Sequence, residues 1–208
     1  MYKRWIDTYQ MSIENFSNSE VNSNVTCVSG YWQIHNKHGN KFEEWFHNSL
    51  KINCPYVFFG DKDSIEMVKK YRVDLPTYYI ELNIEDFVTY KYKNKMITNS
   101  KHSPSIELNL IWNEKIFLVE KASQINPFSS DYFCWIDAGI SIYRDKLPPS
   151  KQFPDINKIN KLPKDKFIFS SSDETHFRKN KVGKNYYHYI SGTYILHKNV
   201  IVMFTKLY

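Results

Sequence analysis

The stretch Tyr-Phe-Cys-Trp-Ile-Asp-Ala-Gly at residues 132–139 decides the fold that this sequence predicts. Five apolar residues in succession indicate a short, fully buried strand, and the Asp-Ala-Gly that follows indicates a turn at its carboxyl end. Similar runs, rich in β-branched and aromatic residues, lie at 25–32, 55–60, 77–82, 167–170 and 187–196. The chain is therefore expected to build a sheet of several short strands.

Apolar residues recur at helical spacing between these predicted strands. They indicate a helix over residues 41–51, a second helix that begins near Ser64, and a long third helix over residues 105–125 that Pro127 ends. Strands that alternate with helices form βαβ units. The sequence thus predicts an α/β fold, with a mostly parallel central sheet and helices on both faces.

The length of 208 residues predicts one domain. Residues 1–24, rich in Ser, Asn and Glu, are expected to form an irregular lead-in, and residues 25–208 a single domain. Residues 88–104 and 145–165 are expected to be surface loops, the second with at most a short helix. No apolar run approaches the about 20 residues that a membrane-spanning helix needs, so we expect no transmembrane segment.

The charge composition says little about partners. The chain carries 28 basic and 22 acidic residues, and all but four of the basic residues are Lys. Nucleic-acid-binding surfaces favour Arg, and an excess of Lys with Asn, Ile and Tyr is what AT-rich codons produce. We therefore expect no nucleic-acid partner and keep a basic nucleic-acid-binding module as an alternative. A site for a small anion such as a nucleotide needs only a few of these charges.

The three cysteines, Cys27, Cys54 and Cys134, each lie in or beside an apolar run. An odd number of cysteines without a C-x-x-C pair argues against a disulfide framework and against a zinc site. We expect buried, reduced thiols, which are typical of a reducing compartment such as the cytoplasm.

Three places in the sequence are candidates for ligand contacts, because ligands of parallel α/β sheets bind beyond the carboxyl ends of the strands. They are Ser29–Gln33 after the first predicted strand, Asp61–Ser64 after the second, and Asp137–Gly139 after the fourth. In the first of these places, Ser29, Gly30 and Tyr31 are the candidates for donor contacts. All three places contain polar groups or glycine, which is also true of ordinary turns in α/β proteins.

Asp137 is the strongest candidate for chemistry. Its carboxylate follows a buried strand, and the small Ala138 and Gly139 behind it would let a bulky ligand approach the backbone. Such a carboxylate can hold a divalent cation that bridges a pyrophosphate. The alternative is structural, with Asp137 capping a turn and Gly139 supplying a positive φ angle.

The stretch Asp61-Lys62-Asp63 has the form of a D-x-D metal motif. We prefer to interpret Asp63 as the cap of the helix that follows. Asp61 would then contact a nucleoside, because the position after the second strand of a nucleotide-binding half often holds an acidic residue that contacts the base or ribose.

Residues 126–140, Asn-Pro-Phe-Ser-Ser-Asp-Tyr-Phe-Cys-Trp-Ile-Asp-Ala-Gly-Ile, with Trp112 and Lys115 before them, closely resemble the hallmark stretch of the HtrL/YibB and WlaTC family. The likeness continues, in order, at 42–46, 57–61, 167–170 and 190–196. It covers about residues 25–205, and members of this family are classed with GT-A-like glycosyltransferases.

The resemblance implies a GT-A-like, Rossmann-related fold and sugar transfer from a nucleotide-sugar donor to a hydroxyl of a glycan or lipid-linked acceptor. Mn²⁺ or Mg²⁺ on Asp137 would neutralise the diphosphate leaving group, helped by Lys115 unless that side chain lies on a solvated helix face. Asp173 and Glu174 are candidates for the base of an inverting reaction, or are exposed loop carboxylates. Gly192 marks close approach of the sugar or an ordinary bulge.

Two features depart from what the resemblance implies, the first from GT-A enzymes in general and the second from the relatives. Asp137 stands alone where GT-A enzymes usually have a D-x-D, and the sequence ends at Tyr208 while relatives look longer. The resemblance therefore leaves a second alternative beside an active enzyme. In that alternative the domain is truncated at its C-terminal end, is catalytically incomplete, and only binds a nucleotide or glycan.

Overall fold

The computed structural model describes residues 24–35, 38–39, 41–100, 103–171, 177–179, 185–187 and 190–208. The strands are β1 (Val25–Tyr31), β2 (Tyr56–Gly60), β3 (Thr77–Glu81), β4 (Tyr132–Ile136), β5 (Ile168–Ser171), β6 (Phe177–Lys179), β7 (Asn185–Tyr187) and β8 (Ile190–His197). The α-helices are α1 (Lys41–Leu50), α2 (Lys62–Tyr71), α3 (Ile106–Ile125), α4 (Ile156–Ile159) and α5 (Lys198–Leu207). Three 3-10 helices are η1 (Ile84–Asp86), η2 (Val88–Lys95) and η3 (Ser141–Tyr143).

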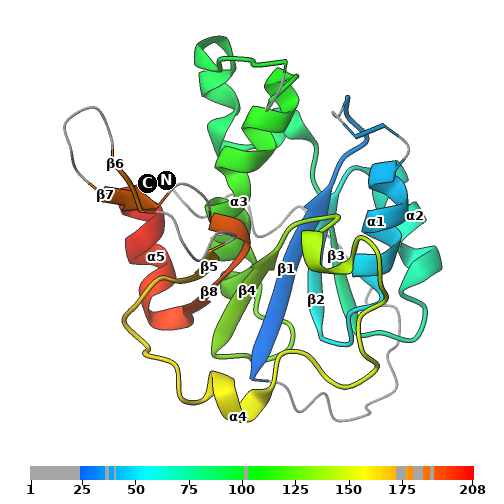
Figure 1. Cartoon of the computed structure of the whole chain (residues 1–208), viewed down its shortest axis with the longest axis vertical. Helices are drawn as coiled ribbons and strands as arrows, with labels where there is room; N and C mark the ends of the chain where they lie inside the picture. The colour runs from blue at the N-terminus through cyan, green and yellow to red at the C-terminus, as the bar shows by residue number, and fades with distance from the viewer. Residues whose placement is uncertain are drawn as a thin grey trace.

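Six strands form one sheet in the order β3-β2-β1-β4-β8-β5, and β6 and β7 pair separately (Figure 1). The first four strands of this order run parallel, whereas β8 runs antiparallel to both β4 and β5. The predicted α/β fold with a mostly parallel central sheet is confirmed. The strands β2 and β4 flank β1 on opposite sides, so the strand order reverses direction at β1. The carboxyl ends of β1 and β4 therefore lie at a topological switch point of the sheet.

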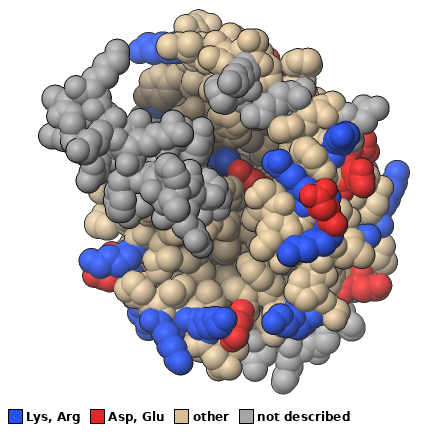
Figure 2. Space-filling view, viewed as in Figure 1, with Lys and Arg blue, Asp and Glu red and all other residues tan. Residues whose placement is uncertain are grey.

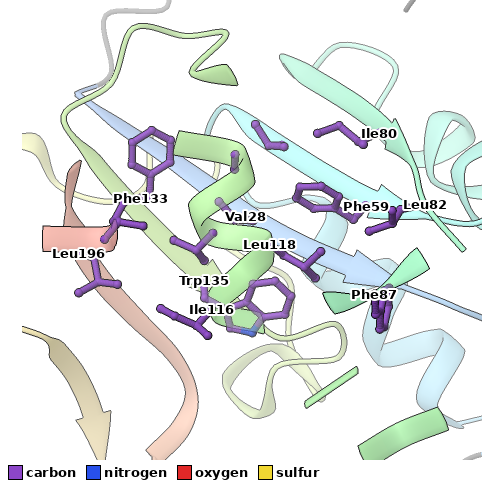
Figure 3. Close-up of a cluster of buried hydrophobic side chains, with 14 of the residues drawn as sticks. Val28, Phe59, Ile80, Leu82, Phe87, Ile116, Leu118, Phe133, Trp135 and Leu196 are labelled. Atoms are coloured by element: carbon purple, nitrogen blue, oxygen red, sulfur yellow. The ribbon is translucent and has the colours of Figure 1, made fainter. Parts of the chain in front are cut away.

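Helices cover both faces of the sheet, as predicted, because side chains on each strand alternate between two cores. On one face, Val28, Phe133 and Trp135 pack with residues of α3 and α5 (Figure 3). On the other face, Cys27 and Cys134 pack with residues of α1, α2 and α4. Strands buried on both sides read as continuous apolar runs, which explains why the sequence signal for them is strong.

The structure confirms the expected state of the cysteines. Cys27, Cys54 and Cys134 are buried and free of disulfide bonds. Among the residues that the structure describes, none of the helices combines the length and apolar character needed to cross a bilayer.

Residues 88–104 were expected to be a loop, but they begin with the 3-10 helix η2. The buried carboxylate of Glu114 on α3 accepts hydrogen bonds from the backbone N–H groups of Val88 and Thr89, at 2.9 and 3.0 Å, and from the Thr89 hydroxyl at 2.7 Å. It thus satisfies the first free N–H groups of η2 from a distant part of the chain. A local pattern search cannot find this partner.

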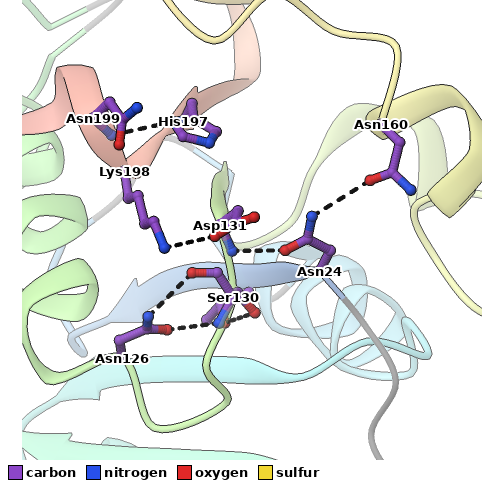
Figure 4. A network of polar contacts seen from close by, with 9 residues as sticks. Asn24, Asn126, Ser130, Asp131, Asn160, His197, Lys198 and Asn199 are labelled. Atoms are coloured by element: carbon purple, nitrogen blue, oxygen red, sulfur yellow. Dashed lines mark hydrogen bonds and ion pairs between the residues drawn. The ribbon is translucent and has the colours of Figure 1, made fainter.

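His197 is the N-cap of α5, and its capping hydrogen bond depends on pH. Its Nδ1 accepts a hydrogen bond from the Asn199 backbone N–H at 3.2 Å, so this nitrogen must be unprotonated (Figure 4). Burial lowers the pKa of His197, although the nearby Asp131 carboxylate opposes the shift. The unfolded chain therefore takes up a proton first as the pH falls below about 6.5, and the folded state loses stability from there down to the lowered pKa.

We expect the His197→Asn variant to show a smaller fall in Tm than the wild type between about pH 7.5 and about pH 5.5. Asn keeps an oxygen that can cap the helix but does not titrate. Thermal unfolding followed by circular dichroism at several pH values measures the difference. Some slope should remain, because burial also lowers the pKa of His47. Equal slopes for the two proteins would contradict the assignment.

Candidate functional site

A cavity of about 310 Å³ lies at the switch point of the sheet, beyond the carboxyl ends of β1 and β4. Helix α3 contributes one wall and the segment after β4 contributes the other. The lining is mostly apolar and includes the aromatic residues Tyr31, Trp32, Phe42, Trp112 and Trp135. This is the place where open α/β sheets bind their ligands, and the volume lies at the lower end of the range for small-molecule sites.

Seven of the residues predicted from the sequence line this one cavity: Gly30, Tyr31, Lys115, Asp137, Ala138, Gly139 and Gly192. They come from β1, α3, the turn after β4, and β8. The fold therefore brings most of the candidate site together, although up to 162 positions separate its members along the chain, from Gly30 to Gly192.

Lys115 and Asp137 form an ion pair within the cavity. The Lys115 Nζ lies 2.6 Å from Asp137 Oδ1, and the side chains are 20% and 30% exposed. The indole N–H of Trp135 donates a hydrogen bond to the same oxygen, and Nζ lies 5.7 Å from the centre of the Trp135 ring. The alternative of a solvated helix face for Lys115 is thus wrong. The pair is partly shielded from water, where charge interactions are stronger than at an open surface.

Two glycines shape the cavity around Asp137. A Cβ on Gly192 would lie 2.8 Å from Asp137 Oδ2, and the Gly192 carbonyl accepts a 2.8 Å hydrogen bond from the Asp137 backbone N–H. Glycine at this position therefore lets β8 pass directly beside the carboxylate. Gly139 has a φ angle of +67°, so the structural role expected for it is confirmed, and a Cβ there would lie 3.1 Å from the ring of Phe42.

Ser29 and Asp61 do not line the cavity. The Ser29 hydroxyl is buried and donates a 2.7 Å hydrogen bond to the Ile136 carbonyl, which ties the ends of β1 and β4 together. Asp61 caps α2 by accepting a 2.8 Å hydrogen bond from the Ser64 backbone N–H, so the prediction that Asp63 is the cap was wrong. The nucleoside contact of Asp61 stays a prediction.

Asp61 nevertheless lies near the cavity wall. Burial is the main cause that raises the pKa of Tyr31, and the carboxylates of Glu43 and Asp61 add to the effect. The two candidates for a catalytic base, Asp173 and Glu174, lie outside the described residues.

Sequence reasoning missed Arg144, which also lines the cavity. Its guanidinium stacks 4.2 Å from the centre of the Trp45 ring, and its Nε donates a 3.4 Å hydrogen bond to the Gly139 carbonyl. The scarcity of Arg in so Lys-rich a chain is the one signal that could have drawn attention to it.

Residues 80–166 match the model of a family described as "Bacterial protein of unknown function (HtrL_YibB)". The predicted HtrL_YibB resemblance is confirmed over these residues. This HtrL_YibB segment (residues 80–166) contains Lys115, Asp137 and Arg144, whereas Tyr31 and Gly192 lie outside it. A search of the curated proteins finds no match.

Two solved structures are similar at low identity. Mouse xyloside xylosyltransferase 1 in its apo form is 12% identical, with a TM-score of 0.46 over 86% of this chain and 68% of that chain. The 4-diphosphocytidyl-2C-methyl-D-erythritolsynthase of Anaerococcus prevotii DSM 20548 is 12% identical, with a TM-score of 0.45 over 88% of this chain and 75% of that chain.

The HtrL_YibB segment contributes one carboxylate, Asp137, to the described lining of the cavity, which holds no other acidic residue. Nowhere do the described residues place three or more His, Cys, Asp or Glu side chains together as a metal site would need. Asp137 Oδ1 already receives the ammonium of Lys115 and the indole of Trp135. These residues do not fit a divalent cation held by the protein, so we derive no chemical step through a metal.

Proposed function

We propose that this protein is a glycosyltransferase that binds the diphosphate of a nucleotide-sugar donor in the cavity and transfers the sugar to a hydroxyl of a glycan or lipid-linked acceptor. The observation that carries the proposal is that Lys115, Asp137 and Arg144 line one cavity, together with several aromatic side chains, at the switch point of the sheet. Cations suit the diphosphate, and aromatic rings suit the flat faces of a base and a sugar.

In the proposed reaction the acceptor oxygen forms a bond to the anomeric carbon of the sugar. The bond from that carbon to the diphosphate breaks, and the diphosphate leaves with the electron pair. Negative charge therefore grows on the leaving oxygen, where Lys115 and Arg144 would stabilise it. The acceptor hydroxyl gives up its proton to a base, for which Asp173 and Glu174 stay the predicted candidates.

A catalytically incomplete relative is the second candidate function. One observation favours it: the single carboxylate in the described lining, Asp137, is engaged by Lys115 and is poorly placed to act as a base. Such a protein would bind a nucleotide or glycan without turning it over. A nucleic-acid-binding module has less support, because Lys and Arg are interspersed with Asp and Glu over the face around the central hollow (Figure 2).

Thermal unfolding with a panel of UDP-, GDP- and TDP-sugars tests the proposal. A donor at about 100 times its Kd stabilises the folded state by about 2.7 kcal/mol, which should raise Tm by about 5 °C or more. Donor hydrolysis should then be detectable for the same nucleotide-sugar. Ala138→Phe, which fills the cavity, should abolish the shift, and Val73→Phe, an exposed site between α2 and β3, should keep it.

The outcomes separate the candidates. A shift without hydrolysis or transfer, across donors and acceptors, would favour the binding-only protein. No shift with any nucleotide-sugar, together with salt-sensitive RNA or DNA binding that Ala138→Phe leaves intact, would contradict the proposed function.

A further inference from the structure

Both oxygens of the Asp137 carboxylate are surrounded by protein groups, which leaves little room for a metal ion. Its Oδ1 receives two donors, the ammonium of Lys115 at 2.6 Å and the indole of Trp135. Its Oδ2 faces the backbone of Gly192, where the position of a Cβ would be only 2.8 Å away. A divalent cation on Asp137 would therefore sit close to the ammonium of Lys115, and the two positive charges would repel each other.

Lys115 itself is equipped to bind a diphosphate. An ammonium has three donors, and Asp137 uses one of them, which leaves two for phosphate oxygens. Arg144 supplies a second permanent charge in the same cavity, and its bond to the Gly139 carbonyl uses only Nε, leaving the rest of the guanidinium fork for an anion. Aromatic side chains line the same cavity, and the Lys115 side chain is only 20% exposed, so competition from water is reduced.

We infer that Lys115, together with Arg144, binds the diphosphate without a divalent metal, and that Asp137 is a positioning residue that holds the Lys115 ammonium in place. This inference rests on the proposed function and assigns the charge chemistry of the same site. From the sequence, a metal ion on Asp137 was expected to supply most of the positive charge, with Lys115 assisting. The structure instead favours Lys115 and Arg144 as the source of that charge.

The chain contains a matched control for the loss of a Lys–Asp pair. At the opposite end of β4, the Lys198 Nζ lies 2.7 Å from Asp131 Oδ1 (Figure 4). These two side chains are 50% and 36% exposed, and neither lines the cavity. Lys198→Met therefore breaks a pair of the same geometry, at the same strand, without touching the proposed ligand.

The test is calorimetric titration of UDP and GDP into the full chain, once with EDTA and once with Mn²⁺. We expect wild-type affinity to agree within about threefold between the two conditions. Lys115→Met should weaken binding about 10- to 100-fold, the loss typical of a charged hydrogen-bond donor. Asp137→Asn should change it by less than about fivefold, because it removes a negative charge near the diphosphate while its amide oxygen still accepts from Lys115.

Lys198→Met should bind as the wild type does, and Lys115→Arg, which keeps the charge, should recover part of the loss. Circular dichroism establishes that each variant is folded. The inference is overturned if binding requires Mn²⁺, if Asp137→Asn abolishes binding, or if Lys115→Met binds as tightly as the wild type. Absence of binding to any nucleotide by the wild type, with EDTA and with Mn²⁺ alike, would instead contradict the proposed function.

Discussion

Lys115→Met is expected to lower the turnover of a saturating nucleotide-sugar donor by about two to three orders of magnitude, the loss seen when one preorganised electrostatic group is removed. The reason lies in where charge grows during the reaction. The diphosphate gains negative charge as the glycosidic bond breaks, so a cation held beside it stabilises the transition state more than the bound donor. Met keeps the length and apolar stem of Lys, so the aromatic packing around it should survive.

The rate is best measured as release of nucleoside diphosphate at donor concentrations well above KM, in the presence of EDTA. Lys198→Met is the control and should stay within about twofold of the wild type, because its partner Asp131 lies at the far end of β4. Full turnover by the Lys115→Met variant would show that Lys115 does not stabilise the transition state. An equal loss in Lys198→Met would show that stability, not the site, governs the rate.

The family resemblance pointed to Trp112 and Lys115 on α3, while the sequence left open whether Lys115 lies on a solvated helix face. Leu108, Ile111, Trp112 and Lys115 recur at three- and four-residue spacing and share the face of α3 that lines the cavity. The position of Asp137 followed from the apolar run of β4, which is buried on both sides. On α3 and β4, the local spacing of apolar residues and the packing of the folded chain place the same side chains together.

The remainder of the site depends on contacts between distant residues. Arg144 lines the cavity and stacks on Trp45 of α1, a pairing of residues 99 positions apart that no local pattern encodes. From the sequence, the cap of α2 was assigned to Asp63, whereas the structure places it at Asp61, the first residue after β2. The sequence left two interpretations of Gly192 open, a β-bulge or close approach of the sugar. In the structure, Gly192 lies directly against the Asp137 carboxylate.

The amino end of the sheet is held by a buried cation that has no part in the proposed chemistry. Arg72, at the end of α2, is 1% exposed. Its guanidinium donates hydrogen bonds to the carbonyl oxygens of Leu50, Ile52 and Cys54 and to the hydroxyl of Thr77, at 2.6 to 3.1 Å. It also stacks 4.1 Å from the centre of the Tyr56 ring. Leu50 ends α1, and Ile52 and Cys54 lie between α1 and β2, so none of these carbonyls belongs to a strand.

Arg72→Met is therefore expected to lower the free energy of unfolding by about 3 kcal/mol or more, because it fills much of the same volume but removes the donor to the carbonyl groups of Leu50 and Cys54. The Ile52 carbonyl keeps the hydrogen bond from the Cys54 backbone N–H. The corresponding fall in Tm is about 6 to 12 °C for a domain of this size. Urea unfolding at neutral pH measures the change. Lys70→Met, which removes an exposed cation from the same helix, should cost less than about 0.5 kcal/mol. Equal stability of the two variants would show that the Arg72 network contributes no net stabilisation, as the desolvation cost of a buried charge permits.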